Sequence, residues 1–484
     1  MKKKLFNKVL VANRGEIAIR VMRACRELGI ATAAVYSDAD RNAIHVRYAD
    51  EAHHIGGAAA SDSYLQLDRI VKVAHDCGAD AIHPGYGFLA EKPAFPDACE
   101  AAGIKFIGPP ASAMRALGSK LAARQLAAQN GVAVTPGSGA VDAGSALDAA
   151  RRIGFPVMLK PSGGGGGIGM KVVESEAELA SAIESTAQAA RSAFGDATVY
   201  LERYVRNPRH IEIQVICDSH GNAAHLGERE CSIQRRHQKI MEETPSPALT
   251  AAIRAAMGDA AIRAAKAAGY INAGTVEFIF SDGDFYFLEV NARLQVEHPI
   301  TEAVTGIDLV KEQIRVAADL ELGFAQQDID WKGHAIEMRI NAEDPLRKFI
   351  PNPRRISRWV APAGPGVRVD SGFGPGSDVP PNYDSLVAKL IVHGSDRAEA
   401  IARARRALRE FVVVGPATTI PYHRAILDNP DFLAGNLSTR FIEDHPQLVD
   451  AARALAGDQS PFDYGPDPRH VAAAAAAVAA VVRQ

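Results

Sequence analysis

The sequence predicts a mixed fold, α/β in its N-terminal part and α+β further along. Residues 1–118 alternate short apolar runs with segments of helical periodicity, which is typical of βα units around a doubly wound parallel sheet. Later residues replace this alternation with a glycine-rich loop and with strand-like runs joined by a turn sequence, which favours antiparallel pairing. We therefore expect a parallel sheet first and antiparallel sheets after it.

The N-terminal unit, residues 1–118, is predicted from repeated strand and helix signals. Residues 15–28 have helical periodicity, and Gly29 ends that helix. The predicted strands are Lys8–Ala12, Ala31–Tyr36, Ala79–His83 and Lys105–Gly108.

Three further segments follow. The second unit, 119–332, begins with a helix and contains a glycine-rich lid at about residues 132–205. The third, 333–445, combines loops dense in proline and glycine with a basic amphipathic helix over 397–411. The tail, 446–484, has the composition of a linker or a loose helix, and the alternative that the chain is a piece of a longer protein stays open.

Bulk composition limits the class of protein. The 484 residues suffice for about two to four domains with large cores. A net charge of −3, from 54 basic and 57 acidic side chains, leads us to expect neither nucleic acid nor a membrane as partner. The five cysteines are scattered without a CxxC pair, which argues against a disulfide framework and a zinc site. Together with an N-terminus unlike a signal peptide, this predicts a cytoplasmic protein.

Polar residues on alternate positions are the strongest clue to function. They are Glu289, Asn291, Arg293, Gln295 and Glu297, and the residues between them include Leu288, Val290, Leu294 and Val296. In an extended chain the polar set shares one face and the apolar set the opposite, buried one. Oxygen ligands beside a guanidinium suit a divalent metal held together with an anionic substrate. An edge strand with a solvated polar face is the simpler alternative.

A second strand supports the metal interpretation. Residues 275–280 precede the alternating stretch, and the turn sequence 281–284 predicts a hairpin that brings Glu277 almost opposite Glu289. The two carboxylates share a face only if the loop has an odd number of residues or the hairpin contains a bulge. A plain two-residue Asp-Gly turn would pair Glu277 with Leu288 and exclude the metal site.

The glycine-rich loop predicts a phosphate contact. Five consecutive glycines, 163–167, follow an apolar strand and Lys160. Such a backbone can approach phosphates closely and donate N–H groups to them. The loop is no Walker motif, because Lys160 precedes the glycines, and a disordered linker is the alternative.

Three further segments contribute polar candidates. Residues 199–205 form a strand and connector that could face an adenine edge, although a plain strand explains them as well. In extended form Arg235, His237 and Lys239 would share one face and bind phosphate or a small anion, unless this is a solvated basic loop. Arg339 stands among apolar neighbours. It is a further candidate for the site, and a purely structural ion pair to Glu337 or Glu343 is the simpler alternative. In this order the segments predict a nucleotide and metal site that activates an oxyanion by phosphoryl transfer.

At these residues the chain resembles the biotin carboxylase component of biotin-dependent carboxylases, within the ATP-grasp superfamily. The matching stretches are 11–18, 83–89, the glycine loop, 230–239, 291–299, 339–344 and 381–385. The run from Arg293 through Pro299 is the most specific. The resemblance implies an ATP-grasp fold with an N-terminal parallel-sheet domain and a C-terminal α+β domain.

The resemblance implies two half-reactions in one site. ATP phosphorylates bicarbonate to carboxyphosphate, which breaks down to CO2 and phosphate, and N1′ of biotin then takes the carboxyl group. The residues implied for ATP phosphates or ribose are Lys120, Lys160, Gly166, Gly167 and His210; those implied for adenine are Glu202, Arg203, Tyr204 and Val205, with Gln234 and His237 nearby. Glu277, Glu289 and Asn291 would bind Mg²⁺ or Mn²⁺. Lys239, Arg293, Gln295 and the Val296 backbone would hold bicarbonate, Glu297 would deprotonate it, and Arg339 would stabilise the biotin enolate.

The resemblance also implies partners. Because the chain has no Met-Lys-Met biotinylation motif and no carboxyltransferase sequence, biotin would arrive on a separate carrier protein, or on another segment of a longer chain. The final acceptor would be chosen by carboxyltransferase subunits. An acyl-CoA such as acetyl-CoA in fatty acid biosynthesis is the first expectation, and propionyl-CoA, a branched enoyl-CoA, pyruvate and urea stay open as alternatives. Arg20, Arg23, Arg368 and Asp384 match positions of dimer contacts, which suggests a homodimer.

Three positions depart from the family pattern. Ile168 stands where the glycine loop normally carries Arg or Lys, and Ala90 and Pro365 are milder changes. The missing cation in the lid supports one alternative, a nucleotide-binding regulatory or scaffold subunit with impaired turnover. A ligase of the carbamoyl phosphate type is a further alternative, but it would lack the series from Arg293 to His298.

Overall fold

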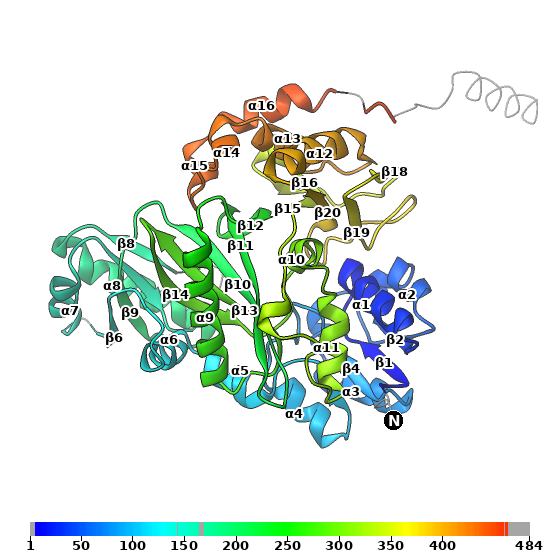
Figure 1. Cartoon of the computed structure of the whole chain (residues 1–484), viewed down its shortest axis with the longest axis horizontal. Helices are drawn as coiled ribbons and strands as arrows, with labels where there is room; N and C mark the ends of the chain where they lie inside the picture. The colour runs from blue at the N-terminus through cyan, green and yellow to red at the C-terminus, as the bar shows by residue number, and fades with distance from the viewer. Residues whose placement is uncertain (1–4, 143, 164–168, 459, 463–484) are drawn as a thin grey trace, which may run out of the picture.

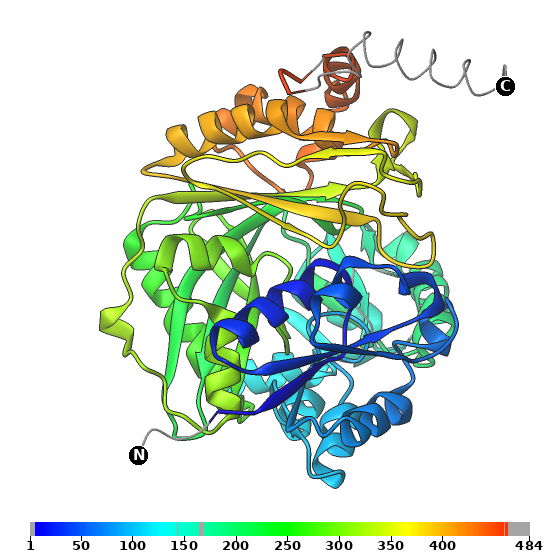
Figure 2. The same ribbon diagram turned by 90° about the vertical axis from the view of Figure 1, so that its right-hand side faces the viewer.

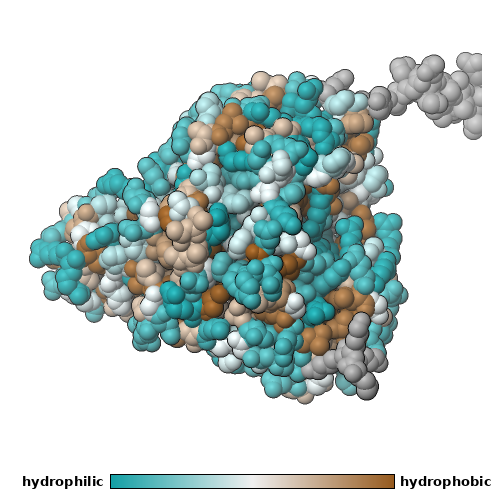
Figure 3. All heavy atoms as spheres, in the orientation of Figure 1, coloured by the Kyte–Doolittle hydropathy of each residue, from teal (hydrophilic) through white to brown (hydrophobic). Residues whose placement is uncertain are grey.

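The structure is a computed structural model that describes residues 5–142, 144–163, 169–458 and 460–462 (Figure 1). Most of the glycine loop and the end of the C-terminal tail therefore lie outside the described residues. None of the described helices is long and apolar enough to cross a membrane. Hydrophilic side chains cover most of the face shown in Figure 3.

The N-terminal unit is a parallel sheet of five strands in the order β3-β2-β1-β4-β5. The strands are β1 Lys8–Val11, β2 Ala31–Tyr36, β3 Glu51–His54, β4 Ala81–His83 and β5 Lys105–Phe106. Its helices are α1 Gly15–Glu27, α2 Ile44–Tyr48, α3 Leu67–Asp76, α4 Ala94–Ala101 and α5 Ala111–Leu117, with short 3-10 turns at Asp38–Asp40 and Ala60–Asp62. The predicted βα units are confirmed. The chain order reverses between β1 and β4, so the loops after both strands open at the crevice where such sheets bind ligands.

A small antiparallel sheet in the order β6-β9-β7-β8 forms a separate lobe, on the left in Figure 1. It follows α6 Lys120–Gln129 and consists of β6 Gly137–Val141, β7 Val157–Pro161, β8 Lys171–Val173 and β9 Val199–Arg203. Two helices, α7 Ala146–Ile153 and α8 Glu176–Phe194, bury an apolar core of their own against it. The glycine loop joins β7 to β8 in this lobe.

The largest sheet has eight antiparallel strands in the order β14-β13-β10-β11-β12-β15-β20-β19. They are β10 Arg209–Cys217, β11 Ala223–Arg235, β12 Gln238–Thr244, β13 Asn272–Ser281, β14 Asp284–Asn291, β15 His334–Asn341, β19 Val367–Ser371 and β20 Leu386–Gly394. The associated helices are α9 Ala251–Ala267, α10 His298–Thr305 and α11 Leu309–Ala317, with a 3-10 turn at Gln326–Asp328. Pairing of β12 with β15 carries this sheet across residue 333, so the two units expected on either side share one sheet.

The C-terminal helices cover the end of the large sheet (Figure 2). They are α12 Arg397–Glu410, α13 Ile420–Leu427, α14 Pro430–Ala434, α15 Phe441–Asp444 and α16 Leu448–Leu455. Short strand pairs complete the unit: β16 Glu343–Asp344 with β17 Ile350–Pro351, and β18 Arg358–Val360 with β21 Val412–Val414, with a 3-10 turn at Pro345–Arg347. The predicted basic helix is confirmed as α12.

The start of the tail differs from the expectation of a linker or loose helix. Leu448 and Ala452 of α16 are buried in the apolar core of the C-terminal unit, against α13. Their spacing of four residues places both on one helix face, and this face packs α16 against the rest of the C-terminal unit. That part of the expectation was wrong for residues 448–455.

Candidate active site

A cavity of about 960 Å³ lies between the N-terminal unit, the small lobe, the large sheet and the C-terminal unit, and residues from each of these parts line it. The loops after β1 and β4 contribute Asn13 and Tyr86, and α6 contributes Lys120. The small lobe, the large sheet and the C-terminal unit supply the remaining walls. A space of this size is typical of a small-molecule site.

The β13–β14 hairpin meets the condition for paired carboxylates in an unexpected way. Its turn has only two residues, because Ser281 pairs with Asp284, and this register alone would place Glu277 opposite Leu288. Between Phe278 and Glu277 the register shifts by one, so that Glu277 pairs with Glu289. Leu288 is the extra residue of a β-bulge, which re-aims the following side chains. The bulge thus restores the arrangement that the metal interpretation requires.

The continuous alternating strand expected through Glu297 was wrong beyond Asn291, where β14 ends. Gln295 and Glu297 instead come from the loop and turn before α10, and they still reach the cavity region because the loop folds back toward β13. The apolar positions also divide differently. Val290 and Leu294 are buried as expected, whereas Leu288 and Val296 line the cavity.

A tight turn replaces the extended basic strand expected at residues 235–239. Arg236 and His237 have φ of 50° and 63°, and they join β11 to β12. Gln234 therefore lies opposite Lys239, and the side chain of His237 is exposed at the tip. The prediction that Arg235, His237 and Lys239 share one strand face was wrong, although all three line the cavity.

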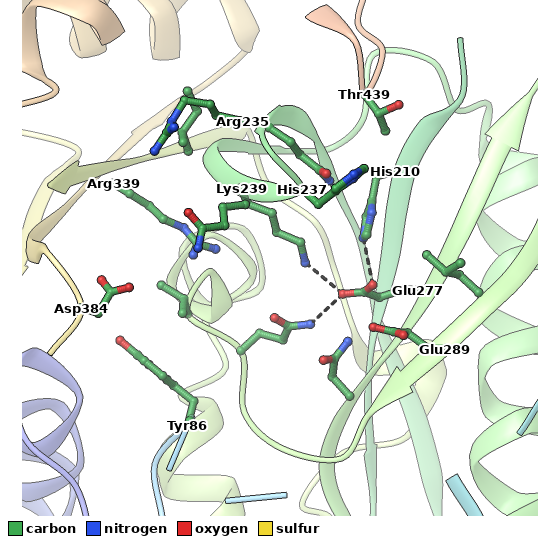
Figure 4. Close-up of a pocket in the computed structure, with 18 of the residues that line it drawn as sticks. Tyr86, His210, Arg235, His237, Lys239, Glu277, Glu289, Arg339, Asp384 and Thr439 are labelled. Carbon is green, nitrogen blue, oxygen red and sulfur yellow. Dashed lines mark hydrogen bonds and ion pairs between the residues drawn. The ribbon is translucent and has the colours of Figure 1, made fainter. Parts of the chain in front are cut away.

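Lys239 is the centre of a buried ion cluster, and Figure 4 shows its contact with Glu277. Its Nζ lies 3.1 Å from Glu277 Oε1 and 2.7 Å from Glu297 Oε1, and it also contacts Glu212. Burial alone would lower the pKa of Lys239, but the carboxylates around it outweigh burial and raise that pKa well above its usual value. Lys239 is therefore a fixed positive charge facing the cavity.

Glu297 lies between two cations. Its Oε1 faces Lys239, and its Oε2 accepts a hydrogen bond of 2.9 Å from Arg339. Burial would raise the pKa of this carboxyl, but Lys239, Arg339 and Arg229 together hold it well below its usual range. Glu297 is therefore ionised. Arg339 also binds Glu242 at 2.7 Å, rather than Glu337 or Glu343 as the simple alternative proposed.

The residues expected to hold a metal fit that role. Glu277 and Glu289 lie side by side on neighbouring strands, and Asn291 follows on the same strand as Glu289. The Nζ of Lys120 lies 2.9 Å from Glu289 Oε2, so a cation already faces this carboxylate. Two carboxylates and an amide oxygen form the hard donor set that Mg²⁺ or Mn²⁺ prefers.

Two bonds hold Glu277 in place within this set. His210 Nε2 lies 3.2 Å from Glu277 Oε2, and Gln295 Nε2 donates to Glu277 Oε1 at 3.2 Å. Figure 4 shows the contacts of His210 and Lys239 converging on Glu277. The carboxylate is therefore oriented from three sides.

The small lobe contributes a second buried ion pair. Lys160 Nζ lies 2.6 Å from Glu202 Oε2, and Arg124 Nη1 lies 3.1 Å from Glu202 Oε1. Arg203, Tyr204 and Val205 continue from Glu202 along the cavity wall, with Gln234 and His237 on the opposite hairpin. Gly166, Gly167 and Ile168 lie outside the described residues.

Several residues of the site were not among those predicted from the sequence. Glu91, from the loop after β4, binds Arg293 at 3.0 Å. Arg229 is fully buried, and its Nε donates to Glu212 Oε1 at 2.5 Å. The signal for Glu212 was present, since His210, Glu212 and Gln214 alternate with apolar residues as the polar set of β14 does.

The candidate dimer positions do not all lie together. Arg20 and Arg368 both bind Glu302, at 2.7 and 2.8 Å, and with Arg23 they line a second, open cavity of about 390 Å³. Asp384 lies apart from them, on the wall of the main cavity. Nothing in the sequence indicated that Asp384 would lie in a different cavity from the three arginines.

Comparisons with known proteins give the chain a family. The N-terminal domain of biotin carboxylase matches residues 5–114, the ATP-binding domain of the carbamoyl-phosphate synthase L chain matches 119–324, and the biotin carboxylase C-terminal domain matches 337–444. A pyruvate carboxylase subunit of Methanothermobacter thermautotrophicus is 58% identical over 449 residues, which are 92% of this chain and 91% of that protein. Biotin carboxylase 1 of Bacillus subtilis is 53% identical over 445 residues, 91% of this chain and 99% of that protein. The chain belongs to the biotin carboxylase family.

Solved structures agree with this family. The biotin carboxylase domain dimer of Hydrogenobacter thermophilus 2-oxoglutarate carboxylase, in complex with MgADP, ADP and bicarbonate, has a TM-score of 0.89 and 47% identity, covering 92% of this chain and 99% of that one. A biotin carboxylase complex from Campylobacter jejuni has a TM-score of 0.89 and 46% identity, covering 91% and 99%. The fold is thus that of biotin carboxylases, and the chain is an ATP-dependent ligase that carboxylates biotin.

Proposed function

We propose that the chain catalyses the first half-reaction of a biotin-dependent carboxylase, in which ATP and bicarbonate form carboxyphosphate and biotin on a carrier protein takes the carboxyl group. The observation that carries this proposal is the position of Glu297. It is a fully buried, ionised carboxylate between Lys239 and Arg339, next to the paired Glu277 and Glu289. A proton acceptor thus lies beside a place for an anion and a place for a nucleotide.

The nucleotide would lie between the small lobe and the large sheet. The residues proposed for phosphates or ribose are Lys120, Lys160, Gly166, Gly167 and His210, and those for adenine are Glu202, Arg203, Tyr204 and Val205, with Gln234 and His237. Support comes from Lys120 and Lys160, whose ammonium groups are held by carboxylates at the cavity wall and can turn toward phosphate.

Glu277, Glu289 and Asn291 would hold Mg²⁺ or Mn²⁺. A bound ion of this kind supplies positive charge that neutralises phosphate oxygens during transfer. The protein's own contribution is the orientation of Glu277, through His210 and Gln295.

Bicarbonate would bind Lys239, Arg293, Gln295 and the backbone of Val296, with Glu297 as its general base. In the structure Lys239 and Arg339 both lie on Glu297 and hold its pKa down. An anion that binds these cations weakens their hold on Glu297, so its carboxylate becomes more basic when a proton has to be removed. Arg339 is then free to face the oxygen that becomes negative in biotin.

The finer assignment concerns organisation and acceptor. We propose the domains 1–118, 119–332 and 333–445 with the tail 446–484, and a homodimer. We also propose a separate biotin carboxyl carrier protein and carboxyltransferase subunits as partners, and a cytoplasmic location consistent with five free cysteines.

For the acceptor we propose an acyl-CoA. Pyruvate is the second candidate, because the relative that is 58% identical belongs to a pyruvate carboxylase. Purified carboxyltransferase subunits from the same cell, assayed with each acceptor, separate these two.

Incorporation of labelled bicarbonate into a biotinylated carrier protein tests the proposal. We expect label on biotin only when ATP and Mg²⁺ are present, and its loss in Glu297→Gln. Unlabelled carrier with the parent chain would contradict the function. The alternative of a regulatory subunit with an impaired lid is tested by Ile168→Arg, since a large gain in rate would favour it and an unchanged rate would exclude it.

A further inference from the structure

Lys389 is a fully buried lysine in β20 that lies behind the cavity rather than in its wall. Its Nζ lies 3.1 Å from Glu16 Oε1 and donates a hydrogen bond of 2.9 Å to the carbonyl oxygen of Val296. These partners come from different parts of the chain: Glu16 from the first turn of α1, and Val296 from the loop after β14. Lys389 thus joins the N-terminal unit, the large sheet and the proposed bicarbonate loop at one point.

The charge of Lys389 is maintained by its surroundings. Burial would lower the pKa of its ammonium, but the carboxylates of Glu16, Glu337 and Asp370 outweigh burial, and the net direction is upward. A buried ammonium is costly unless it is paired and hydrogen-bonded. Glu16 supplies the counter-charge, so the bond to Val296 is a separate interaction with an uncharged backbone group.

The carbonyl oxygens of two consecutive residues of this loop are held from behind. The Gln295 oxygen lies 2.8 Å from His298 Nδ1, and the Val296 oxygen is bound by Lys389. Because a trans peptide unit is planar, its N–H points opposite to its C=O. Holding the two oxygens therefore also fixes the directions of the Val296 and Glu297 N–H groups, and with them the start of the Glu297 side chain.

We propose that Lys389 is a positioning residue of the bicarbonate site, acting through the Val296 carbonyl on the backbone of Val296 and Glu297. This role rests on the proposed function, which places bicarbonate against that backbone. Lys389 does not line the cavity, so its effect on bicarbonate is indirect. Small errors in the direction of a donor or a base are costly in such sites, because catalysis depends on pre-set geometry.

The test separates this role from the contribution of Lys389 to stability. Lys389→Met alone leaves Glu16 buried without its counter-charge, so it is combined with Glu16→Gln, which removes the charge and still accepts the hydrogen bond from Tyr86. Replacing both charges of a buried pair with uncharged groups of similar size is often close to neutral for stability. The double variant is therefore expected to unfold near the temperature of the parent.

In this double variant we expect KM for bicarbonate to rise about tenfold or more, equivalent to about 1.4 kcal/mol. KM for ATP is expected to stay close to that of the parent. Glu16→Gln alone keeps the bond to Val296, and the carboxylates of Glu337 and Asp370 still act on the ammonium of Lys389. Because Glu16 itself lines the main cavity and pairs with Lys389, this single variant is the matched control for both effects: its unfolding temperature is measured beside that of the double variant, and its KM for bicarbonate is expected to stay close to the parent value. If the methionine variant does not fold, Lys389→Leu in the same Glu16→Gln background gives the same comparison.

An unchanged KM for bicarbonate in the folded double variant overturns the positioning role, as does an equal rise in both KM values. The parent chain is assayed before the variants. If its ATP hydrolysis does not depend on bicarbonate, the proposed function itself is overturned. A rise confined to bicarbonate in the double variant, and absent from Glu16→Gln, supports the role.

Discussion

Gly372 lies against the first turn of α1, and its replacement by alanine tests how closely the C-terminal unit is packed on the N-terminal one. A Cβ at this position would lie 2.6 Å from the Cα of Gly15 and 2.7 Å from the backbone nitrogen of Glu16. Carbon atoms in contact are normally about 3.5–4.0 Å apart, so the two backbones would have to separate by about 1 Å. Neither obstacle is a side chain that can rotate away.

Forcing an extra methyl group into a packed interface typically costs about 1–3 kcal/mol, and we expect the upper end because both neighbours are backbone. The entropy of unfolding is about 2.1 cal/mol/K per residue, so about 3 kcal/mol lowers the midpoint by about 3 °C if all 484 residues unfold together. A smaller cooperative unit would show a larger shift.

Thermal unfolding of Gly372→Ala measures this effect, with Gly374→Ala as the matched control. Two residues further along, a Cβ would meet only Ile44 Cδ1 at 3.5 Å, which is ordinary contact. We expect Gly374→Ala to unfold with the parent and Gly372→Ala to unfold earlier. Equal midpoints for all three proteins would refute the close packing of these two units.

Three further predictions concern buried ionisable groups. Glu297→Gln should lower bicarbonate-dependent turnover by about 10²–10⁴-fold, the usual contribution of a general base, while ATP still raises the unfolding temperature; turnover within twofold of the parent would exclude its role. Glu202→Leu leaves Lys160 and Arg124 without their buried counter-charge, so urea unfolding should show a loss of about 3–5 kcal/mol, and no loss would contradict the ion pairs. Burial lowers the pKa of His45 from 6.5 to about 4, so this group stays neutral in the fold while the unfolded chain gains a proton, and stability should fall as the pH drops through this window. His45→Leu should flatten that fall, measured by unfolding at several pH values, and an unchanged slope would rule His45 out as its source.

The local signals of the sequence predicted much of the fold. Apolar runs and helical periodicity indicated the parallel sheet and the basic helix α12, because these elements depend on near neighbours in the chain. Of the polar set from Glu289 to Glu297, the first four members line one cavity, and the fully buried Glu297 lies behind its wall in contact with Lys239 and Arg339. Its members meet through a loop and not along one strand, since the alternation ends at Asn291.

Other features depend on contacts distant in sequence. Glu242 binds Arg339, and Arg229 binds Glu212, only because neighbouring strands of the large sheet bring them together. The bulge at Leu288 is a register shift, and the turn sequence left open whether it would occur. The turn at residues 236–237 adopts positive φ without glycine, so the usual turn signal was missing.

ATP hydrolysis by the purified chain with Mg²⁺, measured with and without bicarbonate and with and without free biotin, tests whether this site uses ATP to activate bicarbonate. We expect hydrolysis that requires bicarbonate and rises with biotin, because Glu297 and the cations beside it act on bicarbonate before phosphate is transferred. Hydrolysis that ignores bicarbonate, or ATP binding without hydrolysis under every condition, would contradict it.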